Sequence, residues 1–88
     1  MSMNVMYREP THPGLFLEED YLKPLGITHD MAAYLLGVDK TTIEAFIRKE
    51  LPVSSTLAKR LEQVFKTEWT FWINAQRTYD KWMENQRY

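Results

Sequence analysis

The chain has 88 residues, of which 44% are hydrophobic and 14% aromatic, and its 11 basic and 12 acidic residues leave a net charge of −1. A chain of this length forms one small domain, and its large side chains supply enough apolar area for a core that needs no disulfide bonds or metal ions. It contains no cysteine, which excludes a disulfide framework and a thiolate zinc site. The near-neutral charge disfavours a nonspecific nucleic-acid coat protein, because such proteins are usually strongly basic.

The N-terminal residues 1–10 show no hydrophobic periodicity, and we expect them to form a flexible lead-in. They lack the apolar segment of a signal peptide, and no stretch approaches the roughly 20 apolar residues of a membrane span. We therefore expect a cytoplasmic protein with no membrane partner. The expected single domain occupies residues 11–88.

A first helix is predicted to begin at residues 12–14, where His-Pro-Gly forms a typical helix entry because proline suits the first helical position. The following LFLEEDYL places acidic side chains near the helix N-terminus, where the helix dipole favours them. Proline disfavours helical geometry in the residue before it, so Lys23 and Pro24 are predicted to end this helix. Gly26 then completes the break.

Residues 28–49 have the punctuation of a helix-turn-helix, with two helices separated by a glycine-centred turn. Thr28 is suited to cap the first helix, Gly37 to leave it with positive φ, and Asp39 to cap the second. Apolar side chains recur at helical spacing in the second helix and predict its buried face; they are Ile43, Phe46 and Ile47. The opposite, polar face of such a helix is where DNA-binding proteins carry base-reading side chains. Sequence-specific DNA binding is therefore the leading hypothesis.

The polar face of this second helix carries residue types that suit DNA contacts. Lys40 and Thr41 stand at its N-terminus, the end that usually enters the major groove. Lysine can donate to guanine, and threonine can contact a base, a thymine methyl group or a phosphate. Thr42 and Arg48 are suited to phosphates, whereas Glu44 can accept a hydrogen bond from cytosine. The competing interpretation is an ordinary solvated helix face.

The two histidines, His12 and His29, stand at separate predicted helix starts, and neither has a carboxylate at a convincing spacing or a second metal ligand at i+4. We therefore expect no metal site and no cofactor. His12 is expected to help its helix begin, whereas His29 is expected on the exposed side, where it can help a helix N-terminus to clamp a phosphate. The chain has no glycine-rich phosphate loop and no nucleophile elbow, so the sequence does not favour an enzyme.

Two further helices are predicted after the helix-turn-helix. Pro52 forces an exit from the preceding helix, and Ser54 or Ser55 is predicted to cap a fourth helix that runs to Phe65. Thr67 is predicted to cap a fifth helix that continues to the end of the chain. Since no strand-like alternation persists and no repeat is visible, the expected fold is all-α with five helices.

The predicted C-terminal helix, residues 68–88, carries aromatic side chains at steps of three and four. Those near its start have a simple explanation in closing the core of the bundle. Those farther along extend beyond what so small a core can cover, and exposed aromatic side chains are typical of interfaces. We therefore predict a dimer or partner interface over residues 79–88. The candidate contact residues on this helix are Trp72, Tyr79, Trp82 and Met83.

The phrases HPGLFLEEDYLKPLGIT before the helix-turn-helix and FKTEWTFWINAQRTYDKW after it resemble the HigA-type antitoxins of the Xre (lambda-repressor-like) helix-turn-helix superfamily. The resemblance covers residues 10–82. It implies a five-helix, lambda-repressor-like DNA-binding domain that acts as a homodimer, here with an extended aromatic C-terminal helix. Members of this family neutralise a HigB/RelE-like ribonuclease toxin in type II toxin–antitoxin systems and bind the operator of their own operon to repress it.

Carried over by position, the resemblance implies DNA contacts at His29, Lys40, Thr41, Thr42, Glu44, Ala45 and Arg48. Two of these depart from the family pattern, because glutamine is common at position 29 and a longer polar side chain is common at position 45. From the resemblance as a whole we expect a DNA-binding antitoxin and autorepressor with two partners, its operator DNA and a toxin. The alternative is a protein-interaction module or a solitary transcriptional regulator on the same scaffold, without a toxin partner.

Overall fold

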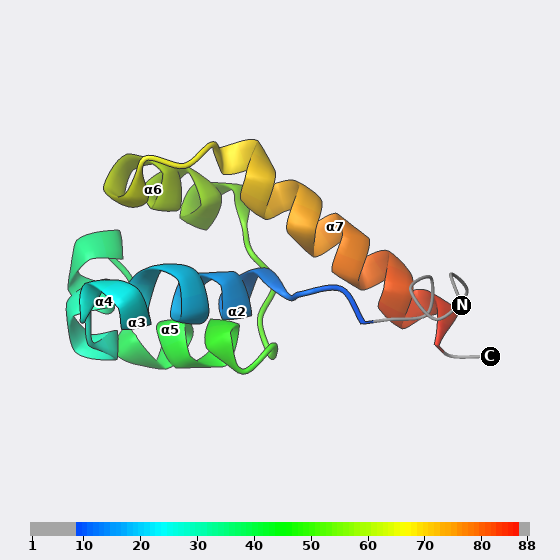
Figure 1. Cartoon of the computed structure of the whole chain (residues 1–88), viewed down its shortest axis with the longest axis horizontal. Coiled ribbons are helices and arrows are strands. Elements are labelled where there is room, and N and C mark those ends of the chain that lie inside the picture. Colours follow the sequence, from blue (N-terminus) through cyan, green and yellow to red (C-terminus); the bar gives the residue numbers. More distant parts are fainter. Residues whose placement is uncertain (1–8, 87–88) are drawn as a thin grey trace.

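The computed structural model describes residues 9–86, and within this range all regular secondary structure is helical (Figure 1). In chain order the elements are α2 (Pro13–Phe16), the π-helical segment η1 (Leu17–Leu22), α3 (Lys23–Leu25), α4 (His29–Leu36), α5 (Lys40–Ile47), α6 (Ser55–Phe65) and α7 (Trp69–Asn85). The first three follow one another directly and form one helix, so the described chain has the five helices that the sequence predicted. The expected flexible lead-in falls largely on residues 1–8, and the predicted C-terminal helix includes residues 87–88; both segments lie outside the described residues.

The first helix runs through Pro24, so the prediction that it ends at Lys23 and Pro24 is wrong. A proline inside an α-helix lacks an N–H donor, and its ring clashes with the carbonyl four residues earlier. The π turn that precedes Pro24 changes this register, because the backbone N–H of Lys23 bonds to the carbonyl of Glu18, five residues earlier. The helix ends instead at Gly26, which adopts the left-handed conformation with φ +67°.

The helix-turn-helix formed by α4 and α5 follows the predicted punctuation closely. The hydroxyl of Thr28 accepts a hydrogen bond of 3.1 Å from the N–H of Met31 and caps α4. Gly37 ends α4 with φ +68°, a conformation that favours glycine. Asp39 stands at the predicted cap position of α5, but its side chain makes no capping hydrogen bond. Thr28 therefore fixes the start of α4, and Gly37 fixes the turn between the two helices.

The C-terminal end of α4 is held by α6. The guanidinium of Arg60 donates from Nη1 to the carbonyl oxygens of Leu36 (3.1 Å) and Gly37 (2.8 Å). These carbonyls belong to the last turn of a helix, which has no intrahelical donor for them and which carries partial negative charge. Arg60 thus fixes the turn that sets the angle between α4 and α5.

The start of α6 confirms one predicted cap, and the start of α7 contradicts another. The Ser54 hydroxyl accepts a hydrogen bond of 3.0 Å from the N–H of Leu57 and caps α6. Glu68, and not Thr67, stands at the cap position of α7. The Thr67 hydroxyl is engaged elsewhere, because it accepts a hydrogen bond of 2.7 Å from the indole N–H of Trp72. Thr67 therefore anchors the core tryptophan instead of capping the helix.

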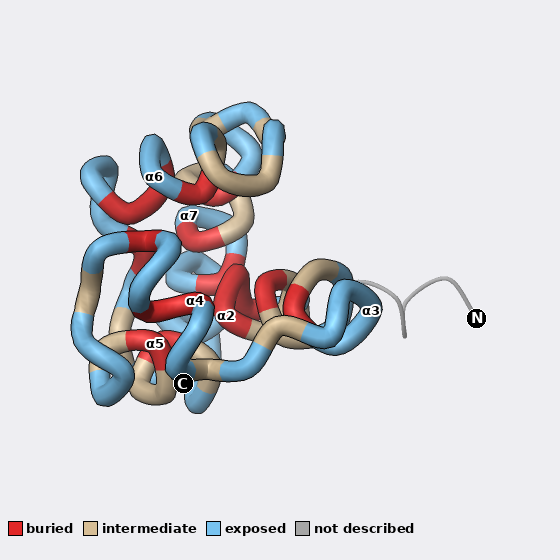
Figure 2. Tube along the Cα trace, turned by 90° about the vertical axis from the view of Figure 1, so that its left-hand side faces the viewer, coloured by how far each residue is buried: buried red, intermediate tan, exposed pale blue. Residues whose placement is uncertain are grey.

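The core lies where the helices converge, and Figure 2 shows the buried positions on the sides that face one another. Its largest apolar side chains are almost completely buried and come from all five helices; they are Leu17, Leu22, Leu36, Ile43, Phe46, Leu61 and Trp72. The C-terminal part of α7 extends away from this core (Figure 1), which gives the molecule its extents of 42 × 22 × 22 Å. The core fixes α4, α5 and the first half of α7 relative to one another.

Candidate nucleic-acid interface

The outward side of α5 carries the residues predicted to contact DNA. Ile43 and Phe46 are completely buried on its inner side, which turns the polar positions of α5 toward solvent. Lys40, Thr41 and Arg48 are exposed, and the remaining predicted α5 contacts, Thr42, Glu44 and Ala45, are partly exposed. Arg48 is the C-terminal cap residue of α5 and so stands at the far end of the face from Lys40. These six residues form what we call the α5 face.

His29 joins the α5 face through hydrogen bonds that the sequence did not reveal. Its Nε2 lies 3.1 Å from Oε1 of Glu18 in η1, and its Nδ1 lies 3.4 Å from Oε2 of Glu44 in α5. No carboxylate stands at a convincing spacing from this histidine along the sequence, yet the fold brings two of them to its ring. Glu18 and Glu44 are 11 and 15 residues away along the chain, and only the crossing of three helices brings them together. No local spacing signals such a contact.

The electrostatic environment of His29 favours its charged form. The hydrogen bond with Glu18, helped by the weaker one with Glu44, raises the pKa of His29 above its ordinary value, although partial burial acts in the opposite direction. The charged ring then connects η1, α4 and α5 through a pair of charge-assisted hydrogen bonds. His29 is consequently less free to clamp a phosphate than the sequence suggested.

Neighbouring carboxylates neutralise both cations of the α5 face. Lys40 lies 3.6 Å from Asp30, and Arg48 lies 3.4 Å from Glu50. All four side chains are at least half exposed, and exposed ion pairs of this kind contribute little free energy. A DNA phosphate can therefore replace the carboxylate at either position at small cost.

The structure also shows an exposed aromatic side chain that the sequence analysis did not single out. Tyr34 of α4 is 82% exposed and lines an open hollow of about 530 Å³ beside the turn between α4 and α5. Thr42 of the α5 face and Asp39 line the same hollow. The buried residues of α4 lie on its other side, so Tyr34 is presented next to the α5 face. Helical periodicity predicts that Tyr34 is exposed only when the buried side of α4 is already known.

Two of the four residues predicted for a dimer or partner interface are buried within the chain. Trp72 is completely buried and bonded to Thr67, so its assignment to an interface is wrong. Tyr79 is 9% exposed because its ring packs edge-on against the buried His12, with centroids 4.8 Å apart. Trp82 is partly buried beside Tyr79, whereas Met83 is 45% exposed. The chain's own first helix covers much of what the sequence placed at an interface.

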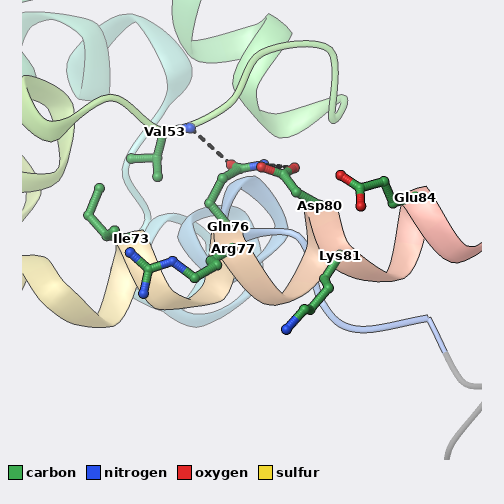
Figure 3. A pocket seen from close by; sticks show the side chains of 7 residues that line it. All are labelled: Val53, Ile73, Gln76, Arg77, Asp80, Lys81 and Glu84. Atoms are coloured by element: carbon green, nitrogen blue, oxygen red, sulfur yellow. Dashed lines mark hydrogen bonds between the residues drawn. The ribbon is translucent and has the colours of Figure 1, made fainter.

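A groove lies between α7 and the loop that connects α5 to α6 (Figure 3). At its floor, the side chain of Gln76 accepts from the N–H of Val53 and donates to Asp80, both at 2.9 Å. The groove has a volume of about 420 Å³, and the residues that line it are Val53, Ile73, Gln76, Arg77, Asp80, Lys81 and Glu84. Among the described residues, Arg77, Lys81 and Glu84 form no ion pair within the chain.

Neither a metal-binding cluster nor a membrane-spanning helix is found within residues 9–86. No group of three or more histidine, cysteine or carboxylate side chains is placed to hold a metal ion in this part of the chain. None of the described helices has the length and apolar character that a membrane span requires.

Comparison with known proteins identifies the family. No protein-family model matches the chain. The chain is 30% identical over 81 residues to the antitoxin HigA-1 of Vibrio cholerae, a match that covers 92% of this chain and 76% of the relative. The chain belongs to the HigA-type helix-turn-helix family. It is also 37% identical over 75 residues to YbaQ, an uncharacterised HTH-type transcriptional regulator of Escherichia coli K12; this match covers 85% of the chain but 66% of YbaQ, just under two thirds of that protein.

Solved structures of two antitoxins and of a protein bound to its operator DNA share the fold. The antitoxin GraA superposes with a TM-score of 0.87 at 32% identity, over 91% of this chain and 86% of GraA. The Pseudomonas aeruginosa antitoxin HigA, solved with the higBA promoter, gives a TM-score of 0.84 at 29% identity, over 89% of this chain and 85% of that one. A third structure, of the P. aeruginosa protein PA4674 with its operator DNA, gives 0.84 at 29% identity, over 89% and 82%. The predicted all-α, HigA-type fold is confirmed.

Proposed function

We propose that this chain is a sequence-specific DNA-binding antitoxin that represses its own operon, with α5 as its recognition helix. The observation that carries the proposal is the α5 face, whose N-terminal residues Lys40 and Thr41 are exposed while the opposite side of α5 is buried. A recognition helix enters the major groove in this orientation, with its N-terminal residues toward the bases. Relatives of the same fold that were solved with promoter or operator DNA support the proposal.

We also propose that the chain acts as a homodimer. Since Lys40 and Arg48 are each balanced by a carboxylate, a single α5 face offers DNA little net positive charge. Two recognition helices about 34 Å apart reach successive major grooves of a palindromic operator and so double the contacts. Dimerisation is therefore the means by which a nearly neutral face reaches useful affinity.

The groove along α7 suits a second copy of the chain, because its charges reverse sign about a point between residues 80 and 81. Packing two α7 helices antiparallel about that point places Arg77 opposite Glu84 of the second copy, and Asp80 opposite Lys81. Both pairings join opposite charges, as a two-fold interface requires of a self-complementary surface. Val53 and Ile73 supply apolar area in the same groove (Figure 3).

The proposed protein partner is a HigB/RelE-like ribonuclease toxin. Membership of the HigA-type family supports this proposal, since the relative from V. cholerae is an antitoxin. A short basic reading frame just upstream of the gene is expected to encode the toxin. Its product should elute together with this chain from a sizing column, and separate elution at micromolar concentration would contradict the assignment.

The recognition helix is tested by replacing its exposed N-terminal residues. Lys40→Ala with Thr41→Ala should weaken binding to the chain's own promoter at least about tenfold, because each lost base contact is worth roughly 1–3 kcal/mol. The melting temperature should stay unchanged, since both side chains are exposed. Fluorescence anisotropy with the promoter duplex and with a scrambled duplex, at one fixed salt concentration, measures the effect.

The matched control replaces the same two residue types on α6, as Lys59→Ala with Thr56→Ala. Both residues are exposed, and α6 lies on the opposite side of the molecule from α5 (Figure 1). This variant should bind like the wild type. Equal binding by the α5 variant, or no preference of the wild type for its promoter over the scrambled duplex, would refute the DNA-binding assignment.

A second candidate function, a protein-interaction module, is favoured by the exposed apolar side chains on α4. Met31, Tyr34 and Leu35 are all exposed there, and clusters of exposed apolar residues mark interaction surfaces. Such a module would retain its protein partner in the α5 double variant and would lose it on Tyr34→Ser. Measuring promoter binding and partner binding for the α5 double variant and for Tyr34→Ser therefore distinguishes the two functions.

A further inference from the structure

The ring of His29 lies between carboxylates from two other helices. Glu18 of η1 is 3.1 Å from Nε2, and Glu44 of α5 is 3.4 Å from Nδ1. A neutral imidazole has one N–H donor and one lone pair, whereas an imidazolium donates from both nitrogens. Two carboxylate oxygens at these positions are therefore both satisfied only when the ring is protonated.

The protonation state of His29 determines the net charge of the group of charged residues around it. The ring lines a shallow hollow of about 350 Å³ whose other charged residues come from η1, α3, α4 and α5; they are Glu18, Lys23, Asp30, Lys40 and Glu44. These three carboxylates and two ammonium groups are balanced when His29 carries a proton and leave one excess negative charge when it does not. The excess falls beside Lys40, at the end of the α5 face expected to enter the groove.

We propose that His29 is a positioning residue of the DNA-reading surface: its protonated ring holds the carboxylate of Glu44 at the start of α4, and loss of that proton releases Glu44 and weakens operator binding. The inference rests on the proposed function and adds its regulation. The contact with Glu44 is the longer of the two, so a neutral ring that keeps one donor keeps it for Glu18. The freed carboxylate of Glu44 then repels approaching phosphates.

The direction of the pH dependence follows from the same contacts. Both carboxylates raise the pKa of His29 in the folded chain, so the clamp's contribution to stability is complete below the ordinary histidine pKa and is lost as pH rises through the raised value. DNA phosphates favour the proton further, and binding therefore takes up protons in this pH range. Operator affinity should be highest on the acidic side of the His29 titration and fall above it.

The first test compares the full-length wild type with His29→Gln, using the promoter duplex from about pH 5.5 to about pH 8.5, a range that covers histidine titration. Wild-type affinity should fall about tenfold across this range, because the bound protein holds the His29 proton more tightly than the free protein does. His29→Gln does not titrate there and should bind with an affinity that is independent of pH. A wild-type affinity that does not change with pH, or an equal change in the variant, would overturn the inference.

The second test separates positioning from a purely structural role. Glu18 lies in η1 and not on the α5 face, so Glu18→Gln should leave promoter binding intact at acidic pH but move the pH midpoint of binding downward. NMR titration of the His29 ring should show the same downward movement, and an upward movement when the promoter duplex is added. His12 serves as an internal control. It is buried, and its ring accepts a hydrogen bond from the N–H of Gly14 instead of contacting Glu18 or Glu44.

The two proposals fail in different ways. Binding of the promoter duplex with no movement of the His29 midpoint would overturn the present inference and leave the proposed function standing. Absence of specific promoter binding at every pH would overturn both.

Discussion

Gly14 is the residue at which the first helix crosses α5. A Cβ at this position would collide with the carbonyl oxygen of Phe46 and lie 2.6 Å from its carbonyl carbon. Because both atoms belong to the backbone of α5, neither can move aside without displacing that helix. Gly14→Ala should therefore lower the free energy of unfolding by about 2–3 kcal/mol, the usual cost of overpacking a tight contact. Urea denaturation followed by circular dichroism measures the change.

Gly26→Ala is the matched control for this prediction. A Cβ there meets no atom within 4 Å, and the only cost comes from the left-handed conformation with φ +67°. That cost is about 1 kcal/mol. If both variants lose the same stability, steric exclusion at Gly14 is not what keeps α5 in place.

Single-residue predictions succeeded where the interaction is local and failed where a distant side chain intervenes. Thr28 and Ser54 bond to an N–H three residues later, and a chain pattern alone reveals such a cap. Thr67 has the right residue type for a cap, but the indole of Trp72 takes its hydroxyl. The clamp on His29 depends on the packing of three helices. The sequence predicted that the residues of the α5 face are turned outward. It did not predict most of the carboxylates that pair with those residues or with His29.

Among the helices, periodicity predicted which segments are helical better than it predicted how they end or what they cover. The first helix continues through Pro24 because η1 changes the hydrogen-bond register, and no pattern of residue types announces a π turn. In α7, the spacing of aromatic residues correctly indicated one face. It also indicated that the aromatic residues near the helix start close the core, as Trp72 does, but it did not show that Tyr79 is buried against His12, the cap residue of the first helix.

The turn between α4 and α5 depends on α6 through Arg60. Arg60→Ala removes two hydrogen bonds to the end of α4 and should lower the free energy of unfolding by about 1.5–3 kcal/mol, since charged donors serve both carbonyls. It should also weaken promoter binding, because the angle between the two helices is less well fixed. Thermal denaturation and anisotropy measure the two effects.

Gln63→Ala provides the control on the same helix, since Gln63 is exposed and makes no side-chain hydrogen bond among those described. Its stability should stay within about 0.5 kcal/mol of the wild type, as is usual for surface positions. An Arg60→Ala variant as stable as Gln63→Ala would show that the helix-turn-helix holds its angle without α6.

At the scale of the whole molecule, the proposed antiparallel packing of two α7 helices requires opposite charges at the paired positions. Arg77→Glu should place like charges opposite each other at both ends of the interface and weaken the dimer, because like-charge juxtaposition is costly. Adding Glu84→Arg to the same chain should restore the dimer, since every pairing is then again between opposite charges. Sedimentation equilibrium of the full chain measures the dissociation constant.

The double variant is the decisive member of this series. If it dimerises no better than Arg77→Glu, the pairing of these two positions is wrong. A dimer whose strength ignores both substitutions would place the interface away from the groove along α7.

His12 contacts the first helix, α5 and α7 at the same time. Its Nδ1 accepts the hydrogen bond that starts the first helix, and its ring meets Phe46 of α5 and Tyr79 of α7 edge-on, at centroid distances of 5.7 and 4.8 Å. Burial lowers the pKa of this ring and so favours its uncharged form. Perturbations at its two aromatic neighbours are therefore not thermodynamically independent, because contacting residues are energetically coupled. The imidazole of His12 thus couples α5 to α7 within the folded chain.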